Sequence, residues 1–111
     1  MDLNQLILDA SLRIKPFIRK TNFCHSETFS KLLDGEVYFK LENQQFTGSF
    51  KARGALNKII TINDAEKSIR SVISASTGNH GAAVAYAARQ ANIECNIYVP
   101  KGSSKAKLYQ K

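Results

Sequence analysis

Residues 71–99, SVISASTGNHGAAVAYAARQANIECNIYV, contain three elements in the order strand, helix, strand. Residues 71–75 and 94–99 are short runs that include valine, isoleucine and tyrosine, which predict strands. Residues 82–91 are mostly alanine, a strong helix former whose small side chain allows close packing. This order and spacing predict a βαβ unit, in which a right-handed crossover joins two parallel strands.

The predicted fold class is therefore α/β, with a parallel sheet and helices in three layers. Parallel sheets are usually covered by helices on both faces and have more strands than this unit supplies. We therefore expect the chain to be a fragment, or one lobe of a larger enzyme.

The sequence also predicts elements on both sides of this unit, from the spacing of apolar residues, from capping residues and from one further strand-forming run. They are, in chain order, a helix over 3–14 that Pro16 ends, a short helix over 26–33 that stops near Gly35, a strand over 36–41, a helix that Ser49 caps and that runs to about residue 60, a helix from Asn63 to Arg70, and a last helix that Ser103 begins.

The composition is that of a soluble globular protein. The chain has 111 residues, 43% of them hydrophobic and 23% charged, which suits one modest domain. No apolar run approaches the ~20 residues that span a bilayer, and the N-terminus lacks the basic region of a signal peptide, so we expect no membrane contact. Two distant cysteines, Cys24 and Cys95, favour a cytoplasmic protein with reduced thiols and no metal site.

The net charge of +7 arises in the second half of the chain. Residues 1–50 hold six basic and six acidic side chains, whereas residues 51–111 hold ten basic and three acidic ones. No aromatic-rich basic stripe or nucleic-acid motif accompanies them, so we expect no nucleic-acid partner. The excess charge predicts a solvated face, or one part of a protein whose acidic partner segment lies elsewhere.

The turn STGNHG, residues 76–81, lies between the first predicted strand and the helix. Backbone N–H groups at a helix N-terminus have no intrahelical partner, and with the helix dipole they suit a carboxylate or phosphate. Gly78 permits close approach of a ligand, and polar side chains beside it can orient that ligand. These side chains belong to Ser76, Thr77, Asn79 and His80. The alternative is a plain strand-to-helix turn with a capping hydroxyl group.

A second candidate feature is Lys51 in the stretch FTGSFKARGA, residues 46–55. A lysine in the first turn of a helix is opposed by the helix dipole, and Arg53 would add like charge if it lay close. We therefore expect a lowered pKa for Lys51, which would make it a candidate imine-forming nucleophile. The alternative is an ordinary exposed lysine, as most lysines are.

The two motifs KLENQQFTGSFKARGALNKI (40–59) and SASTGNHGAAVAYAA (74–88) together resemble pyridoxal-phosphate enzymes of fold type II. They are most similar to the threonine/serine dehydratase and serine racemase group, in order and separation as well as in residues. The resemblance covers roughly residues 13–111. It implies part of a tryptophan-synthase-β-like fold, with residues 1–47 in the large domain of the parent enzyme and 48–111 in its small domain.

The resemblance also implies a role for each site residue, with pyridoxal 5′-phosphate as the cofactor. Lys51 would form the internal aldimine and remove the substrate α-proton, Phe50 would pack beside the pyridine ring, and Asn79 would hydrogen-bond the cofactor 3-oxygen. Thr77 would be a second catalytic residue, at the position where racemases of the group have an acid–base serine. The substrate carboxylate would be held by Ser76, Thr77, Gly78, Asn79 and His80.

The implied activity is that of a threonine/serine ammonia-lyase, which eliminates the β-hydroxyl group of an amino acid to give a 2-oxo acid and ammonia. Ala52 and His80 follow the dehydratase and racemase pattern. The alternatives are a serine or aspartate racemase, a hydroxyaspartate ammonia-lyase, or an inactive fragment or binding module. The family's phosphate-binding glycine run follows residue 111, so we expect the isolated chain to be inactive. The parent enzyme would be a homo-oligomer whose partner is an amino-acid substrate.

Overall fold

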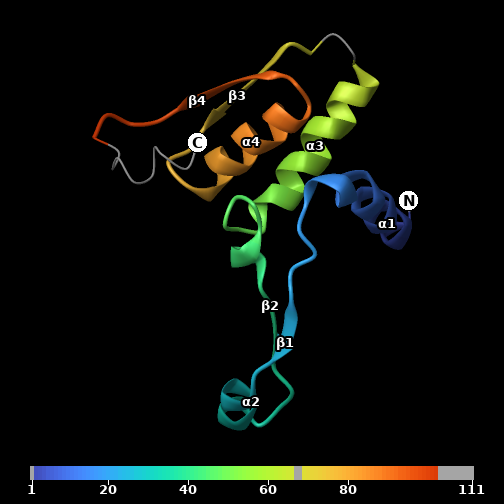
Figure 1. The fold of residues 1–111 in the computed structure, drawn as a ribbon, viewed down its shortest axis with the longest axis vertical. Helices are drawn as coiled ribbons and strands as arrows, with labels where there is room; N and C mark the ends of the chain where they lie inside the picture. The colour runs from blue at the N-terminus through green and yellow to red at the C-terminus, as the bar shows by residue number, and fades with distance from the viewer. Residues whose placement is uncertain (1, 67–68, 103–111) are drawn as a thin grey trace.

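The structure is a computed structural model that describes residues 2–66 and 69–102, so the helix expected from Ser103 lies outside the described residues. Its elements are, in order, α1 (Leu3–Ile14), the 3₁₀ turn η1 (Lys15–Phe17), β1 (Phe23–His25), α2 (Glu27–Leu33), β2 (Tyr38–Lys40), the 3₁₀ turn η2 (Glu42–Gln44), α3 (Lys51–Ala65), β3 (Ser71–Ala75), α4 (Asn79–Gln90) and β4 (Glu94–Tyr98). The Cα radius of gyration is 16.7 Å, against about 13 Å for a compact chain of this length. The chain is therefore extended, as Figure 1 shows.

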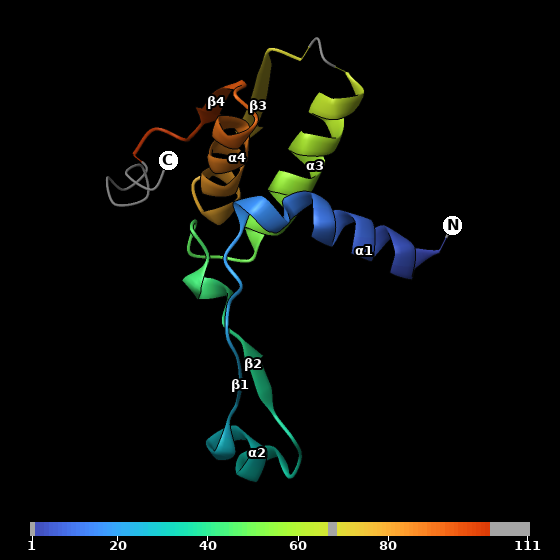
Figure 2. The same cartoon turned by 45° about the vertical axis from the view of Figure 1, so that its right-hand side comes forward.

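The predicted βαβ unit is confirmed. Strand β3 pairs with β4 in parallel, from Ser71 opposite Glu94 to Ala75 opposite Tyr98, and α4 makes the connection between them. Helices α3 and α4 lie on one side of this sheet (Figure 2). The described residues thus supply two layers of the predicted α/β fold, the sheet and one helical layer.

The core lies where α3 crosses α4. Leu56 of α3 is completely buried, and it packs in one cluster with the alanine side of α4 and with Ile14 at the end of α1. Ala83, Ala87 and Ala88 of α4 have no exposed surface. Because alanine side chains are small, the two helix backbones can approach closely, and the position of α3 relative to α4 is fixed by this contact.

Helix α3 differs from its prediction at both ends. It runs unbroken to Ala65, so the expected separate helix from Asn63 is wrong; at the predicted break Ile60 and Ile62 are half-buried, beyond the last buried residue, Ile59. At its start Phe50 already has helical dihedral angles and takes the cap position, so the predicted Ser49 cap is also wrong. The Ser49 hydroxyl is buried without a hydrogen-bond partner in the described structure.

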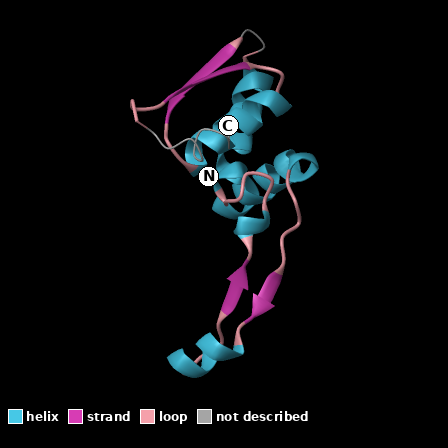
Figure 3. Ribbon diagram, turned by 60° about the vertical axis from the view of Figure 1, so that its left-hand side comes forward, coloured by secondary structure: helices cyan, strands magenta, loops and turns pink. Residues whose placement is uncertain are grey.

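Residues 23–40, which we call the arm, project from the rest of the molecule (Figure 1). Strand β1 was not predicted; it pairs antiparallel with β2, and Figure 3 shows the two strands leading to α2 at the tip. Helix α2 ends at Leu33, before Gly35 as expected, and its C-cap residue Asp34 is left-handed (φ 48°). An aspartate tolerates this conformation better than most side chains do.

Candidate functional site

A pocket of about 460 Å³ lies between α3, the start of α4 and strand β3. Its wall includes Phe50, Lys51, Ser74 and His80, and the remainder is mainly apolar. Small-molecule sites usually have volumes of about 300–1,000 Å³ and an apolar lining with a few polar groups. This pocket meets both conditions.

Lys51 lies in the first turn of α3, as predicted, and is its first residue; its side chain lines the pocket. Its Nζ lies 5.4 Å from the centroid of the neighbouring Phe50 ring, within the range of a cation–π contact. Lys58, about two turns further along the same helix, lines the pocket as well. The pocket thus holds two primary amines, of which Lys51 lies at the helix N-terminus.

A turn connects the carboxyl end of β3 to α4 as the sequence predicts, but it is shorter than expected, because α4 already begins at Asn79 and residues 79–81 form its first turn. The Ser76 N–H donates to the Tyr98 carbonyl at 3.1 Å, which ties the turn to the end of β4. The Gly78 N–H donates to the Ser76 hydroxyl at 3.3 Å. Helix α4 begins at Asn79 with no side-chain cap, so its first N–H groups have no partners within the helix.

The structure brings together only some of the predicted site residues. Phe50, Lys51 and His80 line one pocket. Ser76, Thr77 and Gly78 form the adjacent turn and Asn79 begins α4; these four are not among the residues that line the pocket. A Cβ atom added at Gly78 would meet nothing within 4 Å, so open space remains there for a ligand group to approach the backbone.

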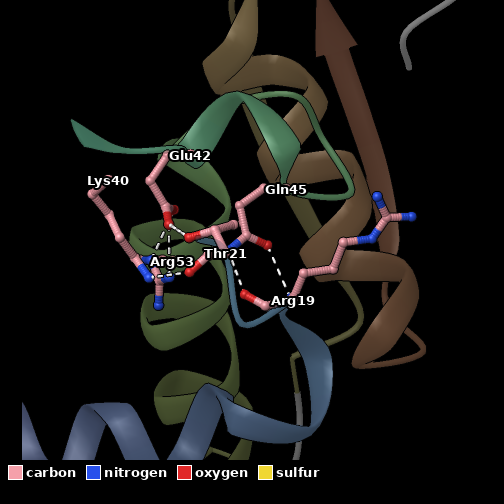
Figure 4. Close-up of polar contacts among 6 residues, drawn as sticks. All are labelled: Arg19, Thr21, Lys40, Glu42, Gln45 and Arg53. Carbon is pink, nitrogen blue, oxygen red and sulfur yellow. Dashed lines mark hydrogen bonds and ion pairs between the residues drawn. The ribbon is translucent and has the colours of Figure 1, made fainter. Parts of the chain in front are cut away.

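The expected like charge from Arg53 is absent, because Arg53 is paired with a residue that the sequence reasoning missed. Its Nε and one terminal nitrogen each donate to the Glu42 carboxylate at 2.8 Å, as Figure 4 shows. The pKa of the Glu42 carboxyl is lowered to about 2, and the largest cause is its hydrogen bonding with the Arg53 guanidinium. Arg53 itself faces a different pocket, beside Lys15 and Arg19. Both residues lie in the motif 40–59, but they are eleven positions apart, and no helix or strand spacing in the sequence indicates that they pair.

Within residues 2–66 and 69–102 there is no group of three or more His, Cys, Asp and Glu side chains that could hold a metal ion. Both cysteines are free thiols, and burial raises the pKa of Cys95. The same part of the chain contains no helix that is long and apolar enough to cross a membrane.

The chain was compared with known proteins. A family model described as pyridoxal-phosphate dependent enzyme matches residues 14–110. Serine racemase of Dictyostelium discoideum is 41% identical over 102 residues, which are 92% of this chain and 31% of that protein. A catabolic L-threonine dehydratase of Staphylococcus aureus is 46% identical over 102 residues, which are 91% of this chain and 29% of that protein.

Solved structures of pyridoxal-phosphate dependent enzymes superpose closely on this chain. A pyridoxal 5′-phosphate-dependent aspartate racemase superposes with a TM-score of 0.88 at 40% identity, covering 96% of this chain and 34% of that one. A serine racemase from maize superposes with a TM-score of 0.86 at 34% identity, covering 96% and 32%. The chain thus spans roughly a third of the length of these relatives. The predicted resemblance is confirmed: the chain belongs to the family of pyridoxal-phosphate dependent enzymes, whose members similar to it include threonine dehydratases and serine racemases.

Proposed function

We propose that this chain is the N-terminal portion of a pyridoxal-phosphate dependent threonine or serine ammonia-lyase. The observation that carries the proposal is the position of Lys51, whose amine lies at a helix N-terminus on the wall of a pocket shared with His80. A primary amine is the group that forms a covalent bond to the cofactor aldehyde. Pyridoxal phosphate, when bound, supplies the electron sink for a carbanion at the substrate α-carbon.

The residues present fit this cofactor. The pocket is large enough for a pyridine ring, Phe50 offers an aromatic wall beside Lys51, and Asn79 directly precedes His80, which lines the pocket. We assign Lys51 to the covalent attachment, Phe50 to packing against the ring and Asn79 to a hydrogen bond with the ring 3-oxygen. The part of the cofactor that carries phosphate would be bound by residues outside this chain.

The turn would hold the substrate. The first N–H groups of α4 have no partners within the helix and lie at its positive end, which supports binding of a carboxylate. Ser76, Thr77 and His80 supply hydroxyl and imidazole groups beside the Gly78 backbone. Lys51 Nζ would take the α-proton, and the β-hydroxyl group would accept a proton and leave as water. Hydrolysis of the released enamine by water would then give a 2-oxo acid and ammonia.

Racemization is the second candidate, because a serine racemase and an aspartate racemase are among the similar proteins. A racemase needs an acid–base group on the face of the substrate opposite Lys51, and the Thr77 hydroxyl is the candidate in this chain. Hydroxyaspartate elimination is a further candidate in the same group. Chiral analysis of the products formed from L-serine and D-serine by the full-length protein separates racemization from elimination.

The test of the attachment site compares Lys51→Ala with Lys58→Ala, since both lysines line the pocket. In the full-length protein treated with pyridoxal 5′-phosphate, we expect Lys51→Ala to abolish the imine absorption near the visible edge. Borohydride trapping and peptide mass mapping should place the label on Lys51, and Lys58→Ala should keep it there. An unchanged spectrum in Lys51→Ala would refute the assignment.

We also propose that this segment alone lacks activity, because it spans 31% or less of the curated relatives above. Titration of the 111-residue chain with pyridoxal 5′-phosphate should give weak, unselective labelling of lysines. Tight stoichiometric labelling at Lys51 would contradict this. The same proposal assigns residues 1–47 to a large domain of the parent enzyme and residues 48–111 to a small one. It also includes a homo-oligomeric parent enzyme and a cytoplasmic location.

A further inference from the structure

A cluster of polar side chains surrounds Glu42 near the start of α3, the helix that carries Lys51 (Figure 4). We call it the Glu42 network, and it consists of Arg19, Thr21, Glu42, Gln45 and Arg53. One carboxylate oxygen of Glu42 accepts from the Thr21 hydroxyl at 2.6 Å, and both oxygens accept from Arg53 at 2.8 Å. The Glu42 side chain is only 14% exposed and that of Arg53 34%. Partial burial makes such a bidentate pair stronger and more rigid than a surface ion pair.

Gln45 ties the same loop to the chain at a second point. Its side-chain amide donates to the Arg19 carbonyl at 2.9 Å, and its carbonyl oxygen accepts from the Arg19 N–H at 3.1 Å. Gln45 is 4% exposed, so this double contact is almost closed to water. Residues 42–50, which lead directly into α3, are therefore held against residues 19–21 at Glu42 and at Gln45.

Arg53 connects this loop to the helix that carries Lys51. Residues two positions apart on an α-helix point about 200° apart, so Arg53 and Lys51 leave α3 on opposite sides. They accordingly line two different pockets. Helix α3 has no side-chain cap at its N-terminus, and the Ser49 hydroxyl just before it has no partner in the described structure. The Arg53–Glu42 contact is thus a side-chain interaction that fixes the first turn of α3 to the preceding loop.

We propose that Glu42 and Arg53 are positioning residues that orient Lys51. By holding the rotation of the first turn of α3, the pair would direct the Lys51 amine into the pocket without touching the pocket itself. This inference rests on the proposed function, because Lys51 matters only if it is the attachment site. A displacement of about 1 Å at a reacting group is enough to cost roughly a hundredfold in rate, so loss of the fork geometry should be measurable.

The test uses Arg53→Lys and Glu42→Gln in the full-length protein. Lysine keeps the positive charge but loses the two-pronged contact, so it separates orientation from charge neutralisation. Glu27→Gln is the matched control, because it removes the carboxylate of an ion pair on the arm that is 81% exposed. Two quantities are measured for each variant: the apparent affinity for pyridoxal 5′-phosphate bound at Lys51, and the hydrogen exchange of the amides of residues 45–53 without added cofactor.

We expect Arg53→Lys and Glu42→Gln to weaken imine formation at Lys51 by roughly tenfold or more and to raise exchange in residues 45–53 by a similar factor. Arg53→Lys should keep a denaturation midpoint close to that of the wild type while it loses affinity for the cofactor. If Arg53 served only to stabilise the fold, affinity and midpoint would fall together. Wild-type affinity and exchange in both variants would overturn the proposal. If the wild type itself forms no imine at Lys51, the proposed function fails, and exchange in the loop alone then decides whether the pair orients α3.

Discussion

The body of the molecule, formed by α3, α4, β3 and β4, and the arm, residues 23–40, are stabilised in different ways. The body has a buried core centred on Leu56 and the alanines of α4. In the arm every residue of β1 and β2 is exposed, and α2 has no buried residue. The arm is held by backbone pairing and by contacts between exposed rings, such as Phe23 stacked on Tyr38 with centroids 5.2 Å apart.

This difference indicates where each region obtains its stability. The candidate site residues lie on the body, where packing of α3 on α4 fixes their backbone positions. A two-stranded hairpin is at best marginally stable in water, so the arm requires support beyond its own contacts. Its exposed rings, among them Phe23, Phe29 and Phe39, are suited to covering by other parts of a larger protein.

The largest expected effect is that of Leu56→Ala in the core. Leu56 is completely buried, so its truncation should lower the free energy of unfolding by about 3 kcal/mol. The matched control is Leu32→Ala in the arm, where the leucine is 73% exposed and the change should be below about 0.5 kcal/mol. Urea denaturation followed by circular dichroism measures both. Equal losses in the two variants would contradict the division into a packed body and an unpacked arm.

The next largest effect is a pH dependence of the free energy of unfolding, which Glu42 causes where the arm joins the body. Its pKa is lowered from 4.5 to about 2, so the folded state binds a proton less readily than the unfolded state. The resulting stability is fully present above about pH 4.5 and is lost as the pH falls through about 2. Between pH 6 and pH 3 the wild type should lose about 2 kcal/mol more than Glu42→Gln. Parallel losses in the two proteins, measured by urea denaturation at each pH, would show that Glu42 is not stabilised in the folded state.

Much of the fold could be predicted from the sequence, because the βαβ unit has strong local signals. The alanine-rich helix and two apolar strands need no tertiary information. The prediction failed where packing overrides local preference: Asn63 and Glu66 resemble a helix start, but α3 runs on to Ala65, with Ile60 and Ile62 half-buried beyond Ile59. Strand β1 has only three residues, too few for a periodic pattern, and it exists because the chain returns at β2 to pair with it.

The candidate site also contains residues that could be predicted from the sequence and contacts that could not. Lys51 and the turn at 76–81 could be found because each lies in a continuous motif next to a helix N-terminus. The Glu42–Arg53 contact, supported by Thr21, could not be found, because it joins three segments that meet only after the arm has turned the chain back. A local sequence pattern carries no information about a tertiary contact between distant segments. From the sequence alone, Arg53 is therefore expected to add positive charge near Lys51, whereas in the structure its charge is paired with that of Glu42.

A smaller effect is expected from Phe39→Ala in the arm. The Phe39 and Phe29 rings meet edge to face with centroids 5.3 Å apart, a contact worth about 1 kcal/mol. Because the arm lacks a core, the loss should appear as local opening: amides of residues 26 and 41 should exchange about fivefold faster, while those of α3 and α4 stay unchanged. Leu33→Ala, which removes an exposed side chain of α2, is the control. Faster exchange throughout the body would mean that the two regions unfold together.

The smallest effect is expected from Glu27→Gln, which removes an ion pair of the same chemical kind as Glu42 with Arg53. Glu27 lies 3.9 Å from Lys31 with both side chains more than 80% exposed, whereas Glu42 lies 2.8 Å from Arg53 and is largely buried. Water and salt screen the exposed pair, so its loss should cost about 0.5 kcal/mol or less, and less again in 1 M salt. Urea denaturation at low and high salt measures this cost. A loss as large as that of Glu42→Gln would mean that burial does not decide the strength of these pairs, and the contrast between body and arm would then need another cause.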